Sequence, residues 1–357
     1  MIKYLSVIIM SFFVISCSTS NSKYNSRDFQ FTYSVDLNPT ANKKIELWIP
    51  IPQSNPVQTI SNLKIDSQGL NYQMKDEMKH GNKYYYIFSE KGIDENKIIK
   101  MTFDVNRHEH SNVEYDNVNN DLYLKASSLV PVGDFFKEII NSNKLDNKNI
   151  RNTYNFVLNG MHYGKPTDDK DSKNYKYIHG GKNPKTGQEW LSNNITYGSK
   201  KKTKNQLVKS QKKNEKYAFG NGNSMYACDI GVGNCTDYHS YFISLNRTLG
   251  VPARFHMGFP IPGDSEGKVG GYHCWADYYV EDEGWFPVDI SEADKDPSKI
   301  EYFFGKVDQN RVEMMVGRDF ELFGYEKGQV NLFVYPILEV DDKESKGFKK
   351  SFTYINI

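Results

Sequence analysis

The regular alternation of apolar and polar residues early in the chain is the feature that most constrains its fold. Large apolar side chains occupy every second position in segments 29–37, 45–49 and 99–105. A period of two is typical of β-strands that bury one face. Clusters of Asn, Gly, Asp and Pro separate these segments, so we expect residues 27–130 to form an all-β, sandwich-like N-terminal domain.

The pattern changes near residue 131, where a second domain is expected to begin. A helical apolar stripe follows, formed by Ile150, Tyr154, Val157 and Met161. It predicts a helix that starts close to Asn149. We assign residues 131–300 to this second domain and 301–357 to a β-rich C-terminal extension. Strand-like runs in the extension, such as 330–335, could close a sheet of the second domain or join the N-terminal sandwich.

A lysine-rich stretch interrupts the second domain. Residues 164–224 are dominated by Lys, Asn, Gly, Ser and Tyr and lack a sustained apolar period. This composition is typical of a solvated surface insertion, and its length also suits a lid or a partner-binding loop. Trp190 is its one strong hydrophobic anchor, and we treat Trp190 as a candidate site-lining residue.

The first residues are typical of an exported protein. Residues 1–16 join a single cation to an apolar run that is too short to cross a bilayer as a helix, which predicts a signal peptide. An aliphatic and a small residue precede Cys17, as in the bacterial lipobox, whose cysteine is acylated. We therefore expect a lipid-anchored cell-envelope protein with a polar tether at 17–26. Ser18 favours the outer membrane, on its periplasmic or surface-facing side. The alternative is an ordinary signal peptide with a chance cysteine.

Net charge gives no argument for a nucleic-acid partner. The chain has 45 basic and 44 acidic residues, and removal of Lys3 with the signal peptide would balance them. The basic run within 200–216 is interpreted as a solvated loop, so recognition is expected to depend on a local site and not on overall charge.

Residues whose side chains could carry out catalysis cluster between 231 and 293. A glycine-rich loop leads into an apolar helical stripe that ends at Gly250, and this predicts a helix with Cys235 at its N-terminus. At that position the helix dipole and free backbone N–H groups favour a thiolate over a thiol. Cys235 is therefore a candidate nucleophile.

Two predicted strands follow this helix. Residues 271–280 alternate like a strand with His273 near its start, and after a turn at Gly284 a second strand ends in Asp289. In a hairpin these two side chains would lie on neighbouring strands. A carboxylate in that place orients an imidazole and stabilises its charged form.

Four sequence blocks resemble those of the transglutaminase-like superfamily in order, spacing and flanking residues. They are NCTDYH at 234–239, LGVPAR at 249–254, HCWAD at 273–277 and GWFPVD at 284–289. The resemblance covers about residues 145–295 and implies an α+β, papain-like/transglutaminase-like core, in which a helix carrying the cysteine packs on an antiparallel sheet. It implies Cys235 as nucleophile, His273 as base and Asp289 as the residue that orients the base.

Such a triad forms an acyl-enzyme, and the second nucleophile decides the reaction. Water would make the protein a protease or amidase, whereas a lysine amine would make it a transglutaminase-type acyltransferase. We favour hydrolysis of a peptide or protein substrate, because water and peptides are abundant in a bacterial envelope. The non-enzymatic alternative is an envelope scaffold or binding module with an idle triad.

The sequence leaves the roles of several nearby side chains undecided. His239 lies one helical turn beyond Cys235 and could line the site or be a polar partner within the fold, and Trp275 is a further site-lining candidate. Arg247 and Arg254 are expected to form structural ion pairs.

The cysteines allow more than one pairing. Cys228 and Cys274 could form a disulfide, remain two buried thiols, or pair with Cys235 in an off-state. A zinc site would draw on Cys228, Cys235, His239, His273 and Cys274. These spacings match no common zinc pattern, so we expect no metal and no cofactor.

Overall fold

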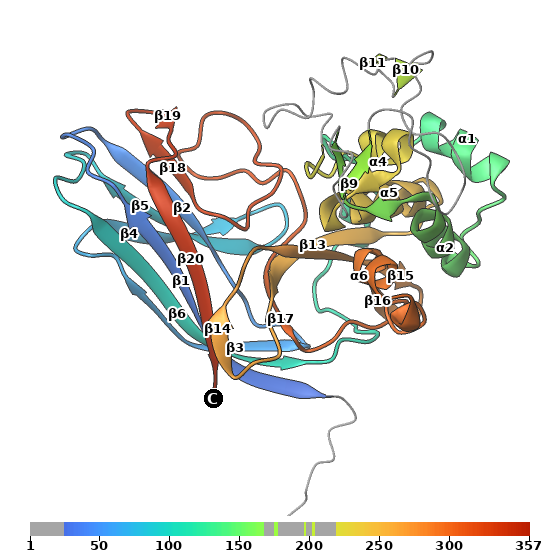
Figure 1. The fold of residues 1–357 in the computed structure, drawn as a ribbon, viewed down its shortest axis with the longest axis horizontal. Helices are drawn as coiled ribbons and strands as arrows, with labels where there is room; N and C mark the ends of the chain where they lie inside the picture. Colours follow the sequence, from blue (N-terminus) through green and yellow to red (C-terminus); the bar gives the residue numbers. More distant parts are fainter. Residues whose placement is uncertain (1–24, 168–174, 178–195, 198–201, 204–218) are drawn as a thin grey trace, which may run out of the picture.

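The structure is a computed structural model that describes residues 25–167, 175–177, 196–197, 202–203 and 219–357. The predicted signal peptide, the lipidation candidate Cys17, Trp190 and most of the predicted insertion lie outside these ranges. Figure 1 shows a β-rich part and a part with helices that lie next to one another. Among the described residues, no helix is long and apolar enough to cross a membrane.

The β-rich part is a sandwich of two five-stranded antiparallel sheets, ordered β14-β20-β1-β6-β3 and β19-β18-β2-β5-β4. Its strands are β1 (Ser26–Leu37), β2 (Ile45–Ile51), β3 (Gln58–Asp66), β4 (Asn71–Glu77), β5 (Asn82–Ser89), β6 (Lys97–His108), β14 (Glu266–Lys268), β18 (Ile337–Val340), β19 (Lys343–Glu344) and β20 (Phe348–Asn356). The sandwich is thus larger than segment 27–130, because strands from late in the chain complete both sheets.

The predicted alternation explains the inner face of the sandwich. In β1 every second side chain is buried, from Phe29 to Leu37. Strand β2 differs because all of its residues are buried. A late segment covers its outer face: the indole of Trp48 donates a hydrogen bond to the Phe323 carbonyl at 2.8 Å and packs edge-on against Tyr325.

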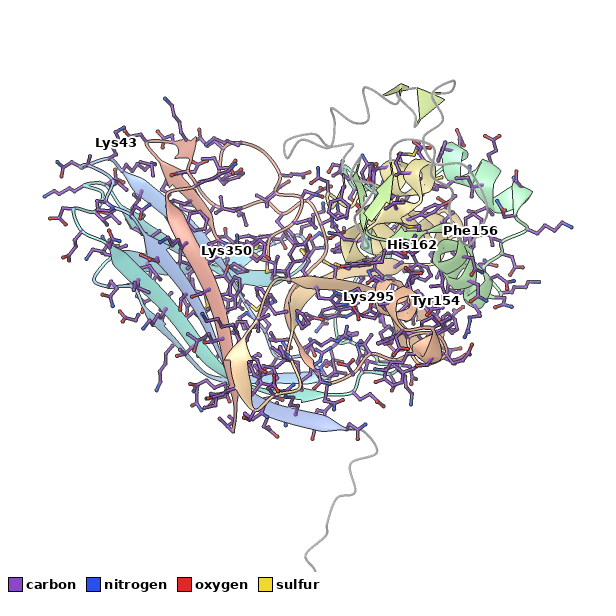
Figure 2. All side chains as sticks on the ribbon, viewed as in Figure 1. Lys43, Tyr154, Phe156, His162, Lys295 and Lys350 are labelled. Atoms are coloured by element: carbon purple, nitrogen blue, oxygen red, sulfur yellow. The ribbon has the colours of Figure 1, made fainter. Side chains whose placement is uncertain are left out.

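The second part is built on a four-stranded antiparallel sheet ordered β16-β15-β13-β17. These strands are β13 (Ala253–Pro260), β15 (His273–Val280), β16 (Gly284–Val288) and β17 (Arg311–Val316). Helix α5 (Cys235–Thr248) packs on one face of this sheet, and α1 (Asp134–Ser142), α2 (Ile150–Gly160), α4 (Ser224–Ile230) and α6 (Ile290–Lys295) surround it. In Figure 2, Tyr154 on α2 and Lys295 on α6 lie in this helical part, while Lys350 on β20 lies in the sandwich.

The remaining elements are short. They are η1 (Asn120–Leu124), η2 (Pro297–Lys299), β7 (His162–Tyr163), β8 (Lys165–Thr167), β9 (Tyr175–Tyr177), β10 (Thr196–Tyr197), β11 (Lys202–Thr203) and β12 (Val232–Gly233). Strands β7 and β12 form a parallel pair that joins the end of α2 to the loop before α5.

The C-terminal segment 301–357 serves both parts of the molecule. Strand β17 joins the four-stranded sheet, whereas β18 and β20 join the sandwich, so both alternatives left open by the sequence occur. The expectation that 330–335 is a strand is wrong, since this run makes only an isolated bridge between Val330 and Phe320. Its Phe333 is fully buried against Tyr84 and Phe320, so its apolar character serves packing and not strand pairing.

Candidate active site

Helix α5 begins at Cys235, as the sequence predicts. The side chain of Asn234 caps it by accepting the backbone N–H groups of Thr236, at 3.0 Å, and of Asp237, at 3.4 Å. The Asp237 carboxylate in turn accepts the Asn234 N–H at 3.1 Å. The loop before the helix is tight: a Cβ on Gly233 would lie 2.5 Å from that of Asp237. The cap therefore fixes the cysteine in the first turn, where unpaired N–H groups and the helix dipole stabilise negative charge.

His273 and Asp289 meet at one end of the β15–β16 hairpin. His273 is the first residue of β15, and Asp289 follows the last residue of β16 and is the N-cap of α6. The Nε2 atom of His273 lies 2.7 Å from Oδ2 of Asp289, and both side chains are buried. The other imidazole nitrogen, Nδ1, is thereby left for Cys235, with which His273 shares a side-chain hydrogen bond.

The three groups set one another's charge. Burial alone would lower the pKa of His273, but the charge of Asp289 and hydrogen bonds to Asp289 and Cys235 raise that pKa to about 10. Burial would raise the pKa of Asp289, and the positive charge of His273 together with that of Arg311 holds it far below its usual range.

Cys235 is the third member of this charge system. A hydrogen bond from Cys274 and the neighbouring His273 hold the pKa of the Cys235 thiol well below its ordinary value, against the opposing effect of burial. The site therefore favours a thiolate beside an imidazolium. The structure brings Cys235, His273 and Asp289 together, as their order in the sequence predicts.

One segment of the chain matches a known protein family. Residues 179–290, a range that contains Cys235, His273 and Asp289, match the model of the transglutaminase-like superfamily. The chain contains a transglutaminase-like domain. The resemblance noted in the sequence is thus confirmed, and with it the α+β fold class and the β-rich region that precedes the domain.

Three further proteins resemble the chain over most of its length. An uncharacterized protein of Haemophilus influenzae is 23% identical over 375 residues, covering 92% of this chain and 89% of that protein. The crystal structure of a "putative cysteine protease" from Cytophaga hutchinsonii aligns with a TM-score of 0.46 at 12% identity, over 93% of this chain and 99% of the other. The periplasmic domain of TgpA from Pseudomonas aeruginosa aligns with a TM-score of 0.31 at 11% identity, over 78% and 75% of the two chains.

His239 is buried between Cys235 and Asp289 and does not line an open surface. Its Nδ1–H donates to the Cys235 carbonyl at 2.7 Å, and its Nε2 accepts the N–H of Ile290 at 3.1 Å. Burial lowers the pKa of His239 to about 4, which agrees with a neutral ring that bonds on both sides. His239 thus ties the start of α5 to the residue after Asp289.

Trp275 packs on the face of the four-stranded sheet that lies opposite α5. It follows Cys274 on β15, so it points away from α5, and its ring stacks on His256 at 5.6 Å and lies 6.4 Å from the ring of His273. The guanidinium of Arg107, on β6 of the sandwich, lies 5.8 Å from the same ring. Trp275 therefore supports His273 at the contact between the two parts of the molecule. Trp190, the other site-lining candidate, lies outside the described residues.

Arg311 is a functional candidate that sequence reasoning missed. Its Nη1 donates to Oδ2 of Asp289 at 3.1 Å, so the carboxylate faces two cationic groups. Arg311 opens β17 and belongs to no recognisable motif, and only long-range pairing places it here. Glu292 was missed as well, and its Oε1 lies 3.9 Å from Nδ1 of His273. Here a signal existed, since Asp289 and Glu292 have the spacing of a helix capping box.

The two other arginines singled out in the sequence form structural contacts. Arg254 makes a buried pair with Asp277 through two of its guanidinium nitrogens. The expectation of an ion pair is wrong for Arg247, which donates instead to the backbone carbonyls of Ala253 and Lys125 and has no acidic partner at ion-pair distance among the described residues.

A metal ion does not suit the site. Among the described residues, His273, Asp289 and Glu292 each offer one ligand atom, and these atoms lie within 4.8 Å of one another. However, Oδ2 of Asp289 already accepts from His273 and from Arg311. Two cationic donors on one carboxylate oxygen favour the observed ion pairs over metal ligation.

Proposed function

We propose that this protein is an exported lipoprotein that cleaves peptide or amide bonds through Cys235, His273 and Asp289. The observation that carries the proposal is the buried hydrogen bond between His273 and Asp289 beside a capped helix that presents Cys235. Membership of the matched segment in the transglutaminase-like superfamily supports acyl chemistry at a cysteine in general.

The geometry suggests how the first half of the reaction proceeds. The Cys235 thiolate attacks the carbonyl carbon of the scissile amide, and the backbone N–H of Cys235 helps to hold the oxyanion. The imidazolium of His273 then gives its proton to the leaving amine as the C–N bond breaks. The products are a free amine and a thioester on Cys235.

The second half restores the thiolate. His273, now neutral, accepts a proton from water, which attacks the thioester carbonyl and releases a carboxylic acid. Asp289 keeps the ring oriented and stabilises its charge in both halves. The same thioester could pass its acyl group to an amine. We favour water, because a peptide substrate in an aqueous envelope meets water at far higher concentration than any amine.

Product analysis tests the reaction. Purified protein is incubated with peptide libraries, with and without added lysine-type amines, beside Cys235→Ala as the blank. We expect new peptide termini that depend on Cys235 and that change little when amine is added. Amine-dependent cross-links without new termini would make the protein an acyltransferase instead. Absence of both products would favour the scaffold alternative.

The anchor has its own test, because its residues lie outside the described ranges. The lipobox-like residues before Cys17 motivate the proposal. In cells fed a labelled fatty acid, the protein should carry the label and sediment with membranes, while Cys17→Ser should lose the label and become soluble. Cys228→Ser is the matched control and should behave like the wild type. Unchanged membrane attachment of Cys17→Ser would contradict the lipid anchor.

A further inference from the structure

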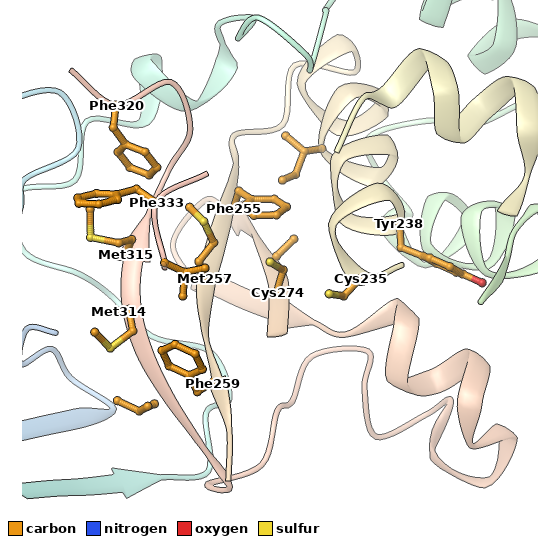
Figure 3. Packing of buried hydrophobic residues seen from close by; sticks show 14 of the residues in the cluster. Cys235, Tyr238, Phe255, Met257, Phe259, Cys274, Met314, Met315, Phe320 and Phe333 are labelled. Atoms are coloured by element: carbon orange, nitrogen blue, oxygen red, sulfur yellow. The ribbon is translucent and has the colours of Figure 1, made fainter. Parts of the chain in front are cut away.

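A second thiol lies directly beside the proposed nucleophile. Cys274 follows His273 on β15, and strand alternation turns its side chain toward α5. Its Sγ lies 3.8 Å from Oγ1 of Thr236, the residue after Cys235. The thiols of Cys235 and Cys274 share a hydrogen bond, and Figure 3 shows them next to one another between helix and strand.

Cys235 and Cys274 differ in charge, but both are buried. Both residues are buried, with 3% of Cys235 and none of Cys274 exposed, and both are free in the structure. Burial and the neighbouring Cys235 raise the pKa of Cys274, so Cys274 stays protonated and donates to the Cys235 thiolate. A cysteine of lowered pKa with a second cysteine next to it is an arrangement in which the second often resolves oxidation of the first.

The third described cysteine is a poor competitor. Cys228 lies on α4, is hydrogen-bonded to Tyr241, and has its pKa raised to about 12 by burial. Any disulfide of the nucleophile is therefore expected to involve Cys274.

We propose that Cys235 and Cys274 form a reversible disulfide when a hydroperoxide oxidises Cys235, so that Cys274 acts as a resolving cysteine. The inference rests on the proposed function in one respect, since it takes Cys235 to be a thiolate. It adds redox control, because the disulfide removes the nucleophile until a dithiol restores it. The proposed export makes this relevant, since disulfides persist outside the cytoplasm.

The disulfide forms in two steps. The Cys235 thiolate attacks one peroxide oxygen, the O–O bond breaks, and a proton converts the departing hydroxide into water, leaving a sulfenic acid. Cys274 then loses its proton and attacks the sulfur of Cys235. The S–O bond breaks as the S–S bond forms, and a second water leaves. The peroxide has been reduced by two electrons, and the two cysteines have supplied them.

The experiment follows the disulfide itself. Reduced, full-length protein is treated with a few equivalents of hydrogen peroxide, blocked with N-ethylmaleimide, digested and analysed by mass spectrometry. We expect a linked peptide pair that contains Cys235 and Cys274. Iodoacetamide labelling of Cys235 should fall at least tenfold and return after dithiothreitol.

Variants separate resolution by Cys274 from other outcomes. Cys228→Ser should still form the linked pair, and it is the matched control. Cys274→Ser should instead leave a sulfenic acid at Cys235 that dimedone traps and that more peroxide converts to a sulfinic acid beyond rescue by dithiothreitol. Cys274→Ala provides the same comparison if the serine variant fails to fold by circular dichroism. A lasting sulfenic acid in the wild type, or a link from Cys235 to Cys228, would overturn the proposal.

The outcome for this inference is separable from that for the proposed function. Fast, His273-dependent labelling of reduced Cys235 without any disulfide would overturn only the resolving role of Cys274. Slow labelling that ignores His273 would overturn the catalytic proposal, whether or not the linked peptides are found.

Discussion

Asp289 does two structural tasks with one carboxylate. Its Oδ2 accepts from the imidazole of His273 and from Arg311, while its Oδ1 accepts the Glu292 N–H and the hydroxyl of Ser291 at the start of α6. Both oxygens are thus fixed by donors from the backbone and from three side chains. A carboxylate held in this way cannot rotate freely, so the imidazole bonded to it is held as well.

Replacement of this carboxylate should change the proton affinity of the imidazole. In Asp289→Asn the negative charge that raises the pKa of His273 is lost while burial remains. The pKa of His273 should therefore fall from about 10 by more than one unit. NMR titration of the His273 ring protons measures this change.

A neighbouring acid provides the control for that titration. Asp296 caps η2 with a side chain that is 46% exposed, and Asp296→Asn should leave the midpoint of His273 where it is in the wild type. An unchanged midpoint in Asp289→Asn would mean that Asp289 does not set the charge of the imidazole.

At the scale of elements, the start of α5 depends on its cap. Asn234 accepts two backbone N–H groups of the first turn. Loss of such a cap costs about 1 kcal/mol of the free energy of unfolding. Asn234→Ala should show a loss of this size in urea unfolding, and it should also slow the alkylation of Cys235, because the first turn no longer holds its geometry.

Helix α2 offers the matched control. It starts after Asn149, whose side chain makes no capping hydrogen bond. Asn149→Ala should therefore leave stability nearly unchanged. Equal losses in the two variants would show that the Asn234 side chain does not cap α5 in solution.

The elements also show what the sequence could predict. Local sequence patterns predict α5, β15 and β16. They succeed because the glycine turns, the alternation and the helical stripe all lie within about ten residues of the side chains that they position. The same patterns could not place Arg311 beside Asp289 or insert β20 between β1 and β14, since such pairings join residues far apart in sequence. Apolar content alone misled at 330–335, where Phe333 is buried without a strand partner.

Across the whole molecule, the C-terminal strand connects the sandwich to the four-stranded sheet of the second part. Strand β20 pairs with β1 along its length, from Leu37 opposite Phe348 to Phe29 opposite Asn356. Its Phe352 packs on Phe259 of β13 with ring centroids 4.4 Å apart. The core is therefore continuous between the β-rich part and the sheet that carries His273.

Truncation of this contact should destabilise the whole chain. Phe352 is 4% exposed, and Phe352→Ala should lower the free energy of unfolding by about 3–5 kcal/mol, the usual cost of emptying a buried aromatic site. Ile355→Ala on the same strand is the control, because Ile355 is 45% exposed and its loss should cost about 0.5 kcal/mol or less. Urea unfolding measures both, and a Phe352→Ala variant as stable as Ile355→Ala would contradict the shared core.

The pairing of a Cys235 thiolate with the His273 imidazolium underlies all of the proposed chemistry. Its most direct test is the rate at which iodoacetamide alkylates Cys235 at pH 6, where an ordinary thiol with a pKa of about 8.5 is less than about 1% ionised. We expect labelling at least tenfold faster than that of free cysteine, a large loss of rate in His273→Ala, and little change in His108→Ala, whose histidine lies on β6 of the sandwich. Labelling no faster than that of free cysteine, or a rate that His273→Ala leaves unchanged, would contradict this pairing.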